Sequence, residues 1–172
     1  MNQELLIDLI VPTIINRFGL DKKSISADDL KVKLKDLHET IVNKVGSDKL
    51  SKLTACFKIN NTIPSIVDVC KSGVDEIMKD GKIDANDSPT FIRMVRNVCS
   101  NITNITKDSV SVSVEATDLV ELCGFFLKSI IQSTIENPQE QNLANSLITS
   151  ALELISYKVE GKQIKCGCFG CF

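Results

Sequence analysis

The chain contains 172 residues, of which 43% are hydrophobic, 24% charged and 5% aromatic. This length suits one domain, or at most two small ones, with a sizeable core, and the apolar content excludes an intrinsically disordered chain. Twenty basic residues stand against twenty-two acidic ones, so there is no basic excess that would favour binding to nucleic acid.

The N-terminal segment carries acidic residues, Glu4 and Asp8, where a signal peptide would carry basic ones. No uncharged apolar run approaches the roughly 18 residues that a membrane span needs. We therefore expect a protein that is not secreted and that works in a reducing compartment. In such a compartment the seven cysteines would not form a disulfide framework.

Hydrophobic periodicity predicts helices along most of the chain, beginning with residues 3–18, a helix kinked or restarted at Pro12. A second predicted helix ends at Gly46 and carries one apolar stripe, formed by Leu30, Leu34, Leu37, Ile41 and Val45. Residues 48–58 give a weaker helical pattern.

Two strongly amphipathic helices follow in the middle of the chain. The first is predicted to end at Gly81, and its apolar stripe consists of Ile63, Ile66, Val67, Cys70, Val74, Ile77 and Met78. The second begins at Ser88, with Pro89 at the first helical position, and its stripe consists of Phe91, Ile92, Val95, Val98, Cys99 and Ile102.

In the C-terminal part, valines alternate with serines over Ser109–Glu115, which predicts a short strand or an extended linker. Residues 118–136 are apolar on nearly every side, a pattern typical of the buried central helix of a bundle. A last helix opens at Asn137, a cap residue followed by proline. Its predicted apolar stripe consists of Leu143, Leu147, Ile148, Ala151, Leu154, Ile155 and Val159, with Gly161 beyond its end.

Two short patterns recur along the chain. Residues 11–16 match residues 63–68 in residue type, and each copy is followed by a helix-start pattern, at residues 25–29 and 83–87. A third helix start of this type lies at residues 114–118. The recurrence favours a duplicated helix–turn–helix hairpin. We predict an all-α, single-domain bundle of about six to seven helices over residues 1–161, built from such hairpins, and a short Cys-rich tail over residues 162–172.

The turn between the two amphipathic helices has some features of an EF-hand loop. If Gly81 takes position 6, then Asp80, Asp84 and Asp87 fall at positions 5, 9 and 12. However, Met78 offers no oxygen ligand at position 3, and an aspartate at position 12 is too short for the usual bidentate glutamate. We favour a tight interhelical turn over a calcium site, with Gly81 left-handed and Asp84 as a cap, and expect no metal and no cofactor.

The C-terminal tail is the most unusual feature of the sequence, because Cys166, Cys168 and Cys171 fall within its last seven residues, beside two phenylalanines. Upstream lysines at 158, 162 and 165 could meet anionic lipid headgroups. Four interpretations remain open: S-acylation, covalent cross-linking inside an assembly, a soft-metal site, and simple packing of the tail on a partner. The other cysteines lie on apolar helix faces and are expected to be small core residues: Cys56, Cys70, Cys99 and Cys123.

Nothing in the sequence indicates an enzyme. The chain has no Gly-rich phosphate loop, nucleophile elbow or HExxH motif, and its one histidine, His38, lies in a charged stretch that we expect to be a solvated helix face. The lysines of residues 31–35 are balanced by neighbouring aspartates, which argues against a DNA-binding helix. We therefore expect neither a small-molecule substrate nor a nucleic acid partner.

Residues 63–98, with their IPSIVD and KDGKIDANDSP motifs, resemble helical modules of proteins from large icosahedral DNA viruses of the phycodnavirus or mimivirus type. The resemblance implies a minor capsid or virion component and no catalytic residues. We expect a non-enzymatic structural or assembly protein of the virion, whose partners are capsid proteins or other copies of the chain. The alternative is a peripheral membrane adaptor in the cytoplasm, held on the cytoplasmic membrane face by S-acylated Cys166, Cys168 and Cys171.

Overall fold

The computed structural model describes residues 5–106 and 113–160, and within these ranges all regular secondary structure is helical. The α-helices are α1 (Leu6–Phe18), α2 (Ala27–Lys33), α3 (Lys35–Val45), α4 (Ser47–Ile59), α5 (Ile63–Ile77), α6 (Ser88–Thr106), α7 (Ala116–Thr134) and α8 (Pro138–Glu160). Three short 3₁₀ helices are η1 (Leu20–Lys23), η2 (Met78–Asp80) and η3 (Ala85–Asp87). The all-α prediction is confirmed.

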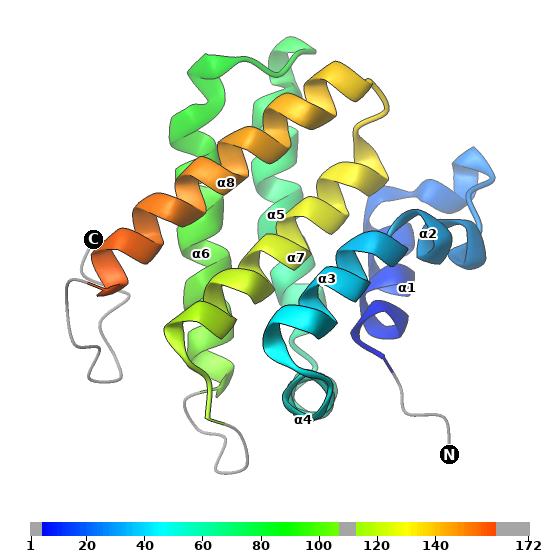
Figure 1. The fold of residues 1–172 in the computed structure, drawn as a ribbon. Coiled ribbons are helices and arrows are strands. Elements are labelled where there is room, and N and C mark those ends of the chain that lie inside the picture. Colours follow the sequence, from blue (N-terminus) through cyan, green and yellow to red (C-terminus); the bar gives the residue numbers. More distant parts are fainter. Residues whose placement is uncertain (1–4, 107–112, 161–172) are drawn as a thin grey trace.

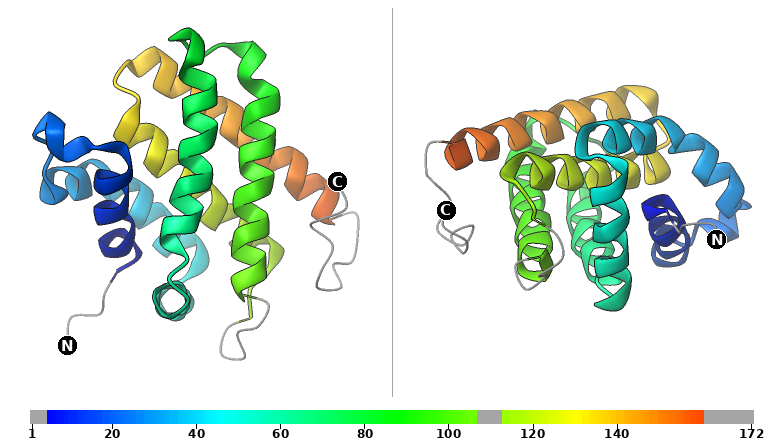
Figure 2. Two further views of the ribbon diagram at one scale, coloured as in Figure 1. Left: turned by 180° about the vertical axis from the view of Figure 1, so that it is seen from behind. Right: turned by 60° about the horizontal axis from the view of Figure 1, so that its bottom comes forward.

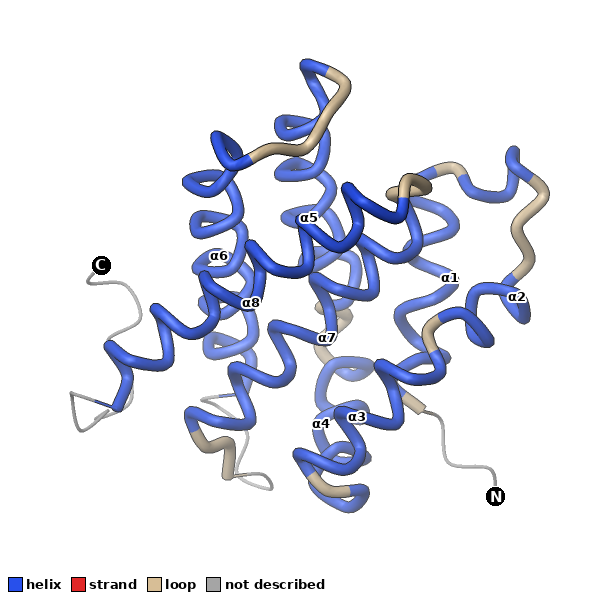
Figure 3. Tube along the Cα trace, turned by 45° about the horizontal axis from the view of Figure 1, so that its top comes forward, coloured by secondary structure: helices blue, strands red, loops and turns tan. Residues whose placement is uncertain are grey.

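The helices are arranged in two layers (Figure 1). Helices α3, α7 and α8 lie side by side with their axes at similar orientations, and they cross over the second layer, which contains α1, α5 and α6 (Figure 2). The tube in Figure 3 shows that α7 and α8 form an antiparallel pair joined by a short loop. This layered arrangement places α7 in the centre of the first layer.

Helix α7 is buried on almost every side, as its apolar sequence predicts. It contacts α8 and α3 within its own layer and α1, α5 and α6 in the layer beneath. Leu122, Cys123, Phe126 and Ile130 have no exposed surface. The ring of Phe126 lies edge-on to Phe57 of α4, with 5.8 Å between the ring centroids. Burial of these side chains, at roughly 25 cal/mol per Å² of apolar surface, is the main stabilising contribution of this helix.

An ion pair fixes the start of α7 against α4. The Lys49 Nζ lies 2.7 Å from Asp118 Oδ2, and the Asp118 side chain is only 7% exposed. The same Asp118 oxygen accepts a hydrogen bond from the Glu115 backbone N–H, so one carboxylate both caps α7 and binds α4. The hydrogen bond to Asp118 raises the pKa of Lys49, which therefore stays charged.

Helix-start residues behave as the recurring pattern predicts. Ser26 accepts a hydrogen bond from the Asp29 N–H at the start of α2, and Asn137 accepts one from the Gln139 N–H at the start of α8. The Asp84 side chain accepts a hydrogen bond from the Asn86 N–H, and this cap opens the short η3 turn rather than α6 itself.

The prediction of one helix over residues 30–45 is wrong, because the chain bends at Leu34. With φ −93° and ψ 0°, Leu34 separates α2, which packs on α1, from α3, which runs along α7. The bend lets both halves of one apolar stripe reach the core on different helices: Leu30 and Ile41 are buried on either side of it.

Three other expectations concern Pro12, the segment before α7 and the C-terminal tail. Helix α1 is one continuous helix with Pro12 inside it, so it does not restart there. Of the predicted strand or linker at Ser109–Glu115, only residues 113–115 are described, and they form no strand. Residues 162–172, the predicted tail, lie outside the described residues.

Two glycines inside helices provide a matched test of this packing. A Cβ added at Gly73 in α5 would lie 2.3 Å from both Cγ and Sδ of the buried Met94 in α6, whereas one added at Gly124 in α7 would meet only Leu152 Cδ1, at 3.2 Å. We expect Gly73→Ala to lower the free energy of unfolding by about 1–2 kcal/mol, because the overlap outweighs the better helix propensity of alanine. Urea denaturation of the wild-type and variant proteins measures this change in the free energy of unfolding.

Gly124→Ala is the control, and we expect it to change stability by less than about 1 kcal/mol, because the end of a leucine side chain can move aside. Introducing Gly73→Ala into a Met94→Ala protein should cost nothing further, since the overlap is then absent. A stabilised Gly73→Ala protein would contradict the close approach of α5 and α6.

Candidate functional site

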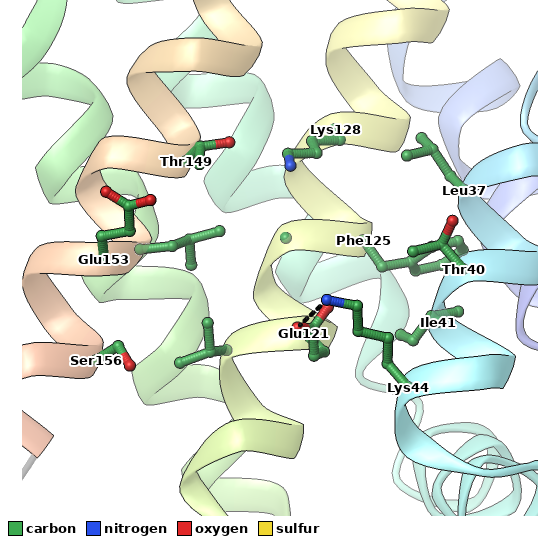
Figure 4. Close-up of a pocket in the computed structure, with 13 residues that line it drawn as sticks. Leu37, Thr40, Ile41, Lys44, Glu121, Phe125, Lys128, Thr149, Glu153 and Ser156 are labelled. Carbon is green, nitrogen blue, oxygen red and sulfur yellow. Dashed lines mark ion pairs between the residues drawn. The ribbon is translucent and has the colours of Figure 1, made fainter. Parts of the chain in front are cut away.

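A groove lies over α7, between α3 and α8, with a volume of about 380 Å³. Figure 4 shows the side chains of all three helices turned toward it. We call it the α7 groove and define it by three sets of residues. These are Leu37, Thr40, Ile41 and Lys44 of α3; Val120, Glu121, Gly124, Phe125 and Lys128 of α7; and Thr149, Leu152, Glu153 and Ser156 of α8.

The floor of the groove follows from the sequence of α7. Its lining residues recur at helical spacing along one stripe, and Gly124 lies in the middle of that stripe. Gly124 contributes no side chain to the floor, where it lies beside the buried Phe125 and is approached by the end of the Leu152 side chain. A helix that is apolar all round thus leaves one face without complete cover.

The rim of the groove carries charges of both signs. Lys44 of α3 forms an ion pair with Glu121 of α7, with 3.4 Å between Nζ and Oε1, which is drawn in Figure 4. Lys128 and Glu153 also line the groove, and no ion pair joins either of them to another of the described residues. The groove therefore offers an apolar floor together with one uncompensated cation and one uncompensated anion.

The single histidine lies next to the groove floor and corrects the expectation that it is on a solvated face. The His38 ring is half-buried and edge-on to Phe125, at 6.2 Å between centroids, and its Nε2 is buried without a hydrogen-bond partner in the described structure. Burial lowers the pKa of His38, while the charges of Asp8 and Glu39 act in the opposite direction. The sequence pattern of charged neighbours gave no signal of this enclosure.

In the EF-hand-like turn, the structure uses the carboxylates to bind backbone N–H groups. Gly81 is left-handed, with φ +80°. Asp80 accepts a hydrogen bond from the Lys82 N–H, and Asp87 accepts one from the Asp84 N–H. Over residues 5–106 and 113–160, no cluster of three histidine, cysteine or acidic side chains is arranged to hold a metal ion.

Two of the predicted core cysteines are bonded to each other. Cys99 of α6 and Cys123 of α7 are fully buried, as expected, and they form a disulfide with 5.8 Å between Cα atoms, which lies within the usual range. Cys70 is a buried free thiol whose pKa is raised by burial, and Cys56 is a partly exposed free thiol. Sequence reasoning missed the pairing, since the spacing of 24 residues is no motif. The tail cysteines Cys166, Cys168 and Cys171 lie outside the described residues.

Comparison with known proteins gives no relative: the chain matches no protein family model, no curated protein and no solved structure. Of the helices that the structure describes, none is both long enough and apolar enough to cross a lipid bilayer.

The enclosure of His38 predicts a pH dependence of stability. Because the folded-state pKa is lowered, the unfolded chain binds more protons as the pH falls below about 6.5, so the free energy of unfolding should decrease from pH 7 to about pH 5.5. His38 is the only histidine in the sequence, so no other side chain with an ordinary pKa titrates in this pH range. Urea denaturation at a series of pH values should show a smaller decrease in His38→Gln. An equal decrease in that variant would contradict the assignment.

Proposed function

We propose that this chain is a non-enzymatic structural protein of an assembly, which acts through contacts of helix α8. A minor capsid or virion component is the setting that the viral resemblance implies. The observation that carries the proposal is an apolar stripe on α8 that the fold covers only in part. Leu143 is 36% exposed and Leu154 is 56% exposed, and the partly buried Leu147 lies between them.

Leu143 and Leu154 lie on a different face of α8 from its buried residues, whereas Leu147, at the edge between the two faces, packs partly against the core. The buried positions of the helix are Ala144, Ile148, Ala151, Leu152 and Ile155. Leu143, Leu147 and Leu154 follow one another at spacings of four and seven residues, which is the spacing of a helix–helix seam. The apolar face of α8 is therefore wider than its contact with the core requires. The part that the core does not cover is suited to contact with a second helix.

The partner that fits this stripe best is α8 of a second copy of the chain. A two-fold contact places each stripe against its own equivalent, and the positions beside the stripe on the solvent side, Gln139, Ser146 and Ser150, are uncharged. Two copies can therefore approach without opposing like charges. A helix of 23 residues is about 34 Å long, enough for all three leucines to interdigitate with their equivalents.

Self-association of the purified full chain tests this proposal. By sedimentation velocity over roughly 10–500 µM, a range that covers weak interfaces, the 18.9 kDa chain should change from monomer to dimer. Leu154→Lys should weaken dimerisation by at least about tenfold, because it replaces a leucine that the dimer would bury with a lysine and places two ammonium groups at the contact.

Val32→Lys is the matched control, because Val32 is an exposed apolar residue on α2 (74% exposed) outside the proposed contact, and it should dimerise like wild type. Circular dichroism should show that both variants stay folded. A wild-type chain that remains monomeric over the whole range, or equal weakening by the two substitutions, would refute the α8 contact.

A second candidate function rests on the tail. Three cysteines beside phenylalanines and two lysines fit a peripheral membrane adaptor held by S-acylation, since two or more acyl chains anchor stably where one does not. If so, hydroxylamine should release the native protein from membranes and reductant alone should not. Triple replacement of Cys166, Cys168 and Cys171 by serine should abolish binding. Release by reductant alone would point to disulfide cross-linking instead.

A further inference from the structure

We propose that the Cys99–Cys123 disulfide is a redox lock, which closes only while α6 and α7 are apart and stays closed in a reducing solution once the chain has folded. The lock does not depend on the proposed function, because dimerisation through α8 concerns the surface and the bond lies in the core. Three observations support it: the burial of both cysteines, the position of the bond in the fold, and the state of the described free thiols.

The first observation is that solvent reaches neither cysteine of the bond. Cys99 and Cys123 have no exposed surface, and the residues about one turn away on the same two helices are fully buried as well: Val95, Ile102 and Phe126. Thiol–disulfide exchange begins when a thiolate attacks one of the two sulfurs, so it requires access to that sulfur. The folded core excludes this approach, and reduction therefore requires the helices around the bond to separate.

The second observation is the position of the bond. It joins α6 to α7, which Figure 1 shows in different layers of the fold. Helix α7 contacts α3 and α8 in its own layer and α1, α5 and α6 in the layer beneath. Exposing Cys123 means withdrawing this central helix from its neighbours, which disrupts most of the core rather than one edge of it. Reduction should accordingly be about as slow as unfolding.

The third observation concerns the free thiols of the described residues. Cys70 of α5 is fully buried, and burial raises the pKa of its thiol, so it provides almost no thiolate to attack the bond from within the core. Cys56 of α4 is partly exposed and shows what a reagent in solution can reach. The fold thus protects the bond both from reductants outside and from exchange with the buried thiol inside.

Closure of the lock is a two-electron oxidation, and a small-molecule disulfide such as oxidised glutathione can carry it out. The thiolate of one cysteine attacks the reagent and releases the first glutathione, and the thiolate of the other attacks the mixed disulfide and releases the second. Two protein thiols lose two protons and two electrons, and the reagent is reduced to two thiols. Because the reagent must reach both protein sulfurs, closure precedes the packing of α7.

The lock makes a buried disulfide compatible with the reducing compartment that the sequence predicts. The chain needs an oxidant only while α6 and α7 are still apart. After folding, a reductant in solution acts no faster than the chain unfolds. The redox state of the surroundings is therefore recorded during folding and is retained in the folded protein.

The rate of reduction tests the lock in the full chain that carries Cys166→Ser, Cys168→Ser and Cys171→Ser, which removes competing thiols. The protein is refolded with oxidised glutathione and treated with dithiothreitol, and alkylation followed by mass spectrometry identifies the free thiols. In native buffer Cys56 should be alkylated readily. The bond should open at least about a hundredfold more slowly than in guanidinium chloride, because opening then requires unfolding.

The converse experiment tests closure. A chain that is folded in reductant and then given oxidised glutathione should form the bond at least about a hundredfold more slowly than a chain that refolds in the presence of the same reagent.

Two matched substitutions separate the bond from the packing of its sulfurs. Cys99→Ala and Cys70→Ala each remove one fully buried sulfur, but only Cys99→Ala breaks the bond. In the oxidised protein, Cys99→Ala should lower Tm by roughly 5–15 °C more than Cys70→Ala, because it also releases the constraint between residues 24 positions apart. In proteins folded and melted in dithiothreitol, the two substitutions should lower Tm by similar amounts.

Three results would overturn the lock. Equally fast reduction in native buffer and in guanidinium chloride would show that the core does not shield the bond. Two free thiols at Cys99 and Cys123 after refolding with oxidised glutathione would show that no bond forms. Equal losses of Tm from the two alanine substitutions in the oxidised protein would show that the bond does not hold the fold.

Discussion

The burial of helix α7 is the constraint on which the rest of the structure depends. A helix that is apolar on nearly every side cannot lie at the surface, so other helices must cover it. Helices α3 and α8 cover its two flanks, and α1, α5 and α6 form the layer beneath it. The Lys49–Asp118 ion pair and the Cys99–Cys123 disulfide both attach α7 to its neighbours. The two-layer architecture is thus a consequence of one segment of sequence.

Covering a helix from two flanks leaves the outer face between them. Two adjacent helices on α7 are separated by roughly twice the interhelical distance of 8–10 Å, and only side chains of intermediate length fill that space. Gly124, one of the residues that line the α7 groove, contributes no such side chain. The same glycine lets Leu152 of α8 approach α7 closely.

The elements that sequence periodicity predicts well are those whose environment is uniform along the helix. Helices α5, α6 and α7 each bury a regular stripe, and their predicted stripe residues Val67, Val95 and Leu122 are fully buried. The bend at Leu34, the enclosure of His38 and the pairing of Cys99 with Cys123 escaped prediction for a common reason. Each depends on which helix lies opposite, and a local pattern of apolar and polar residues holds no information about that.

Helix α8 shows most clearly why an apolar pattern does not by itself identify a core contact. Its sequence predicts a single stripe, but the structure divides that stripe: Ile148 and Ile155 pack inward, whereas Leu143 and Leu154 remain exposed. Its third side, with Thr149 and Glu153, forms a wall of the groove. A monomer's core needs only one of these three faces. The width of the apolar face, compared with the arc that one neighbouring layer can cover, therefore decides how much of a predicted stripe stays exposed in the fold.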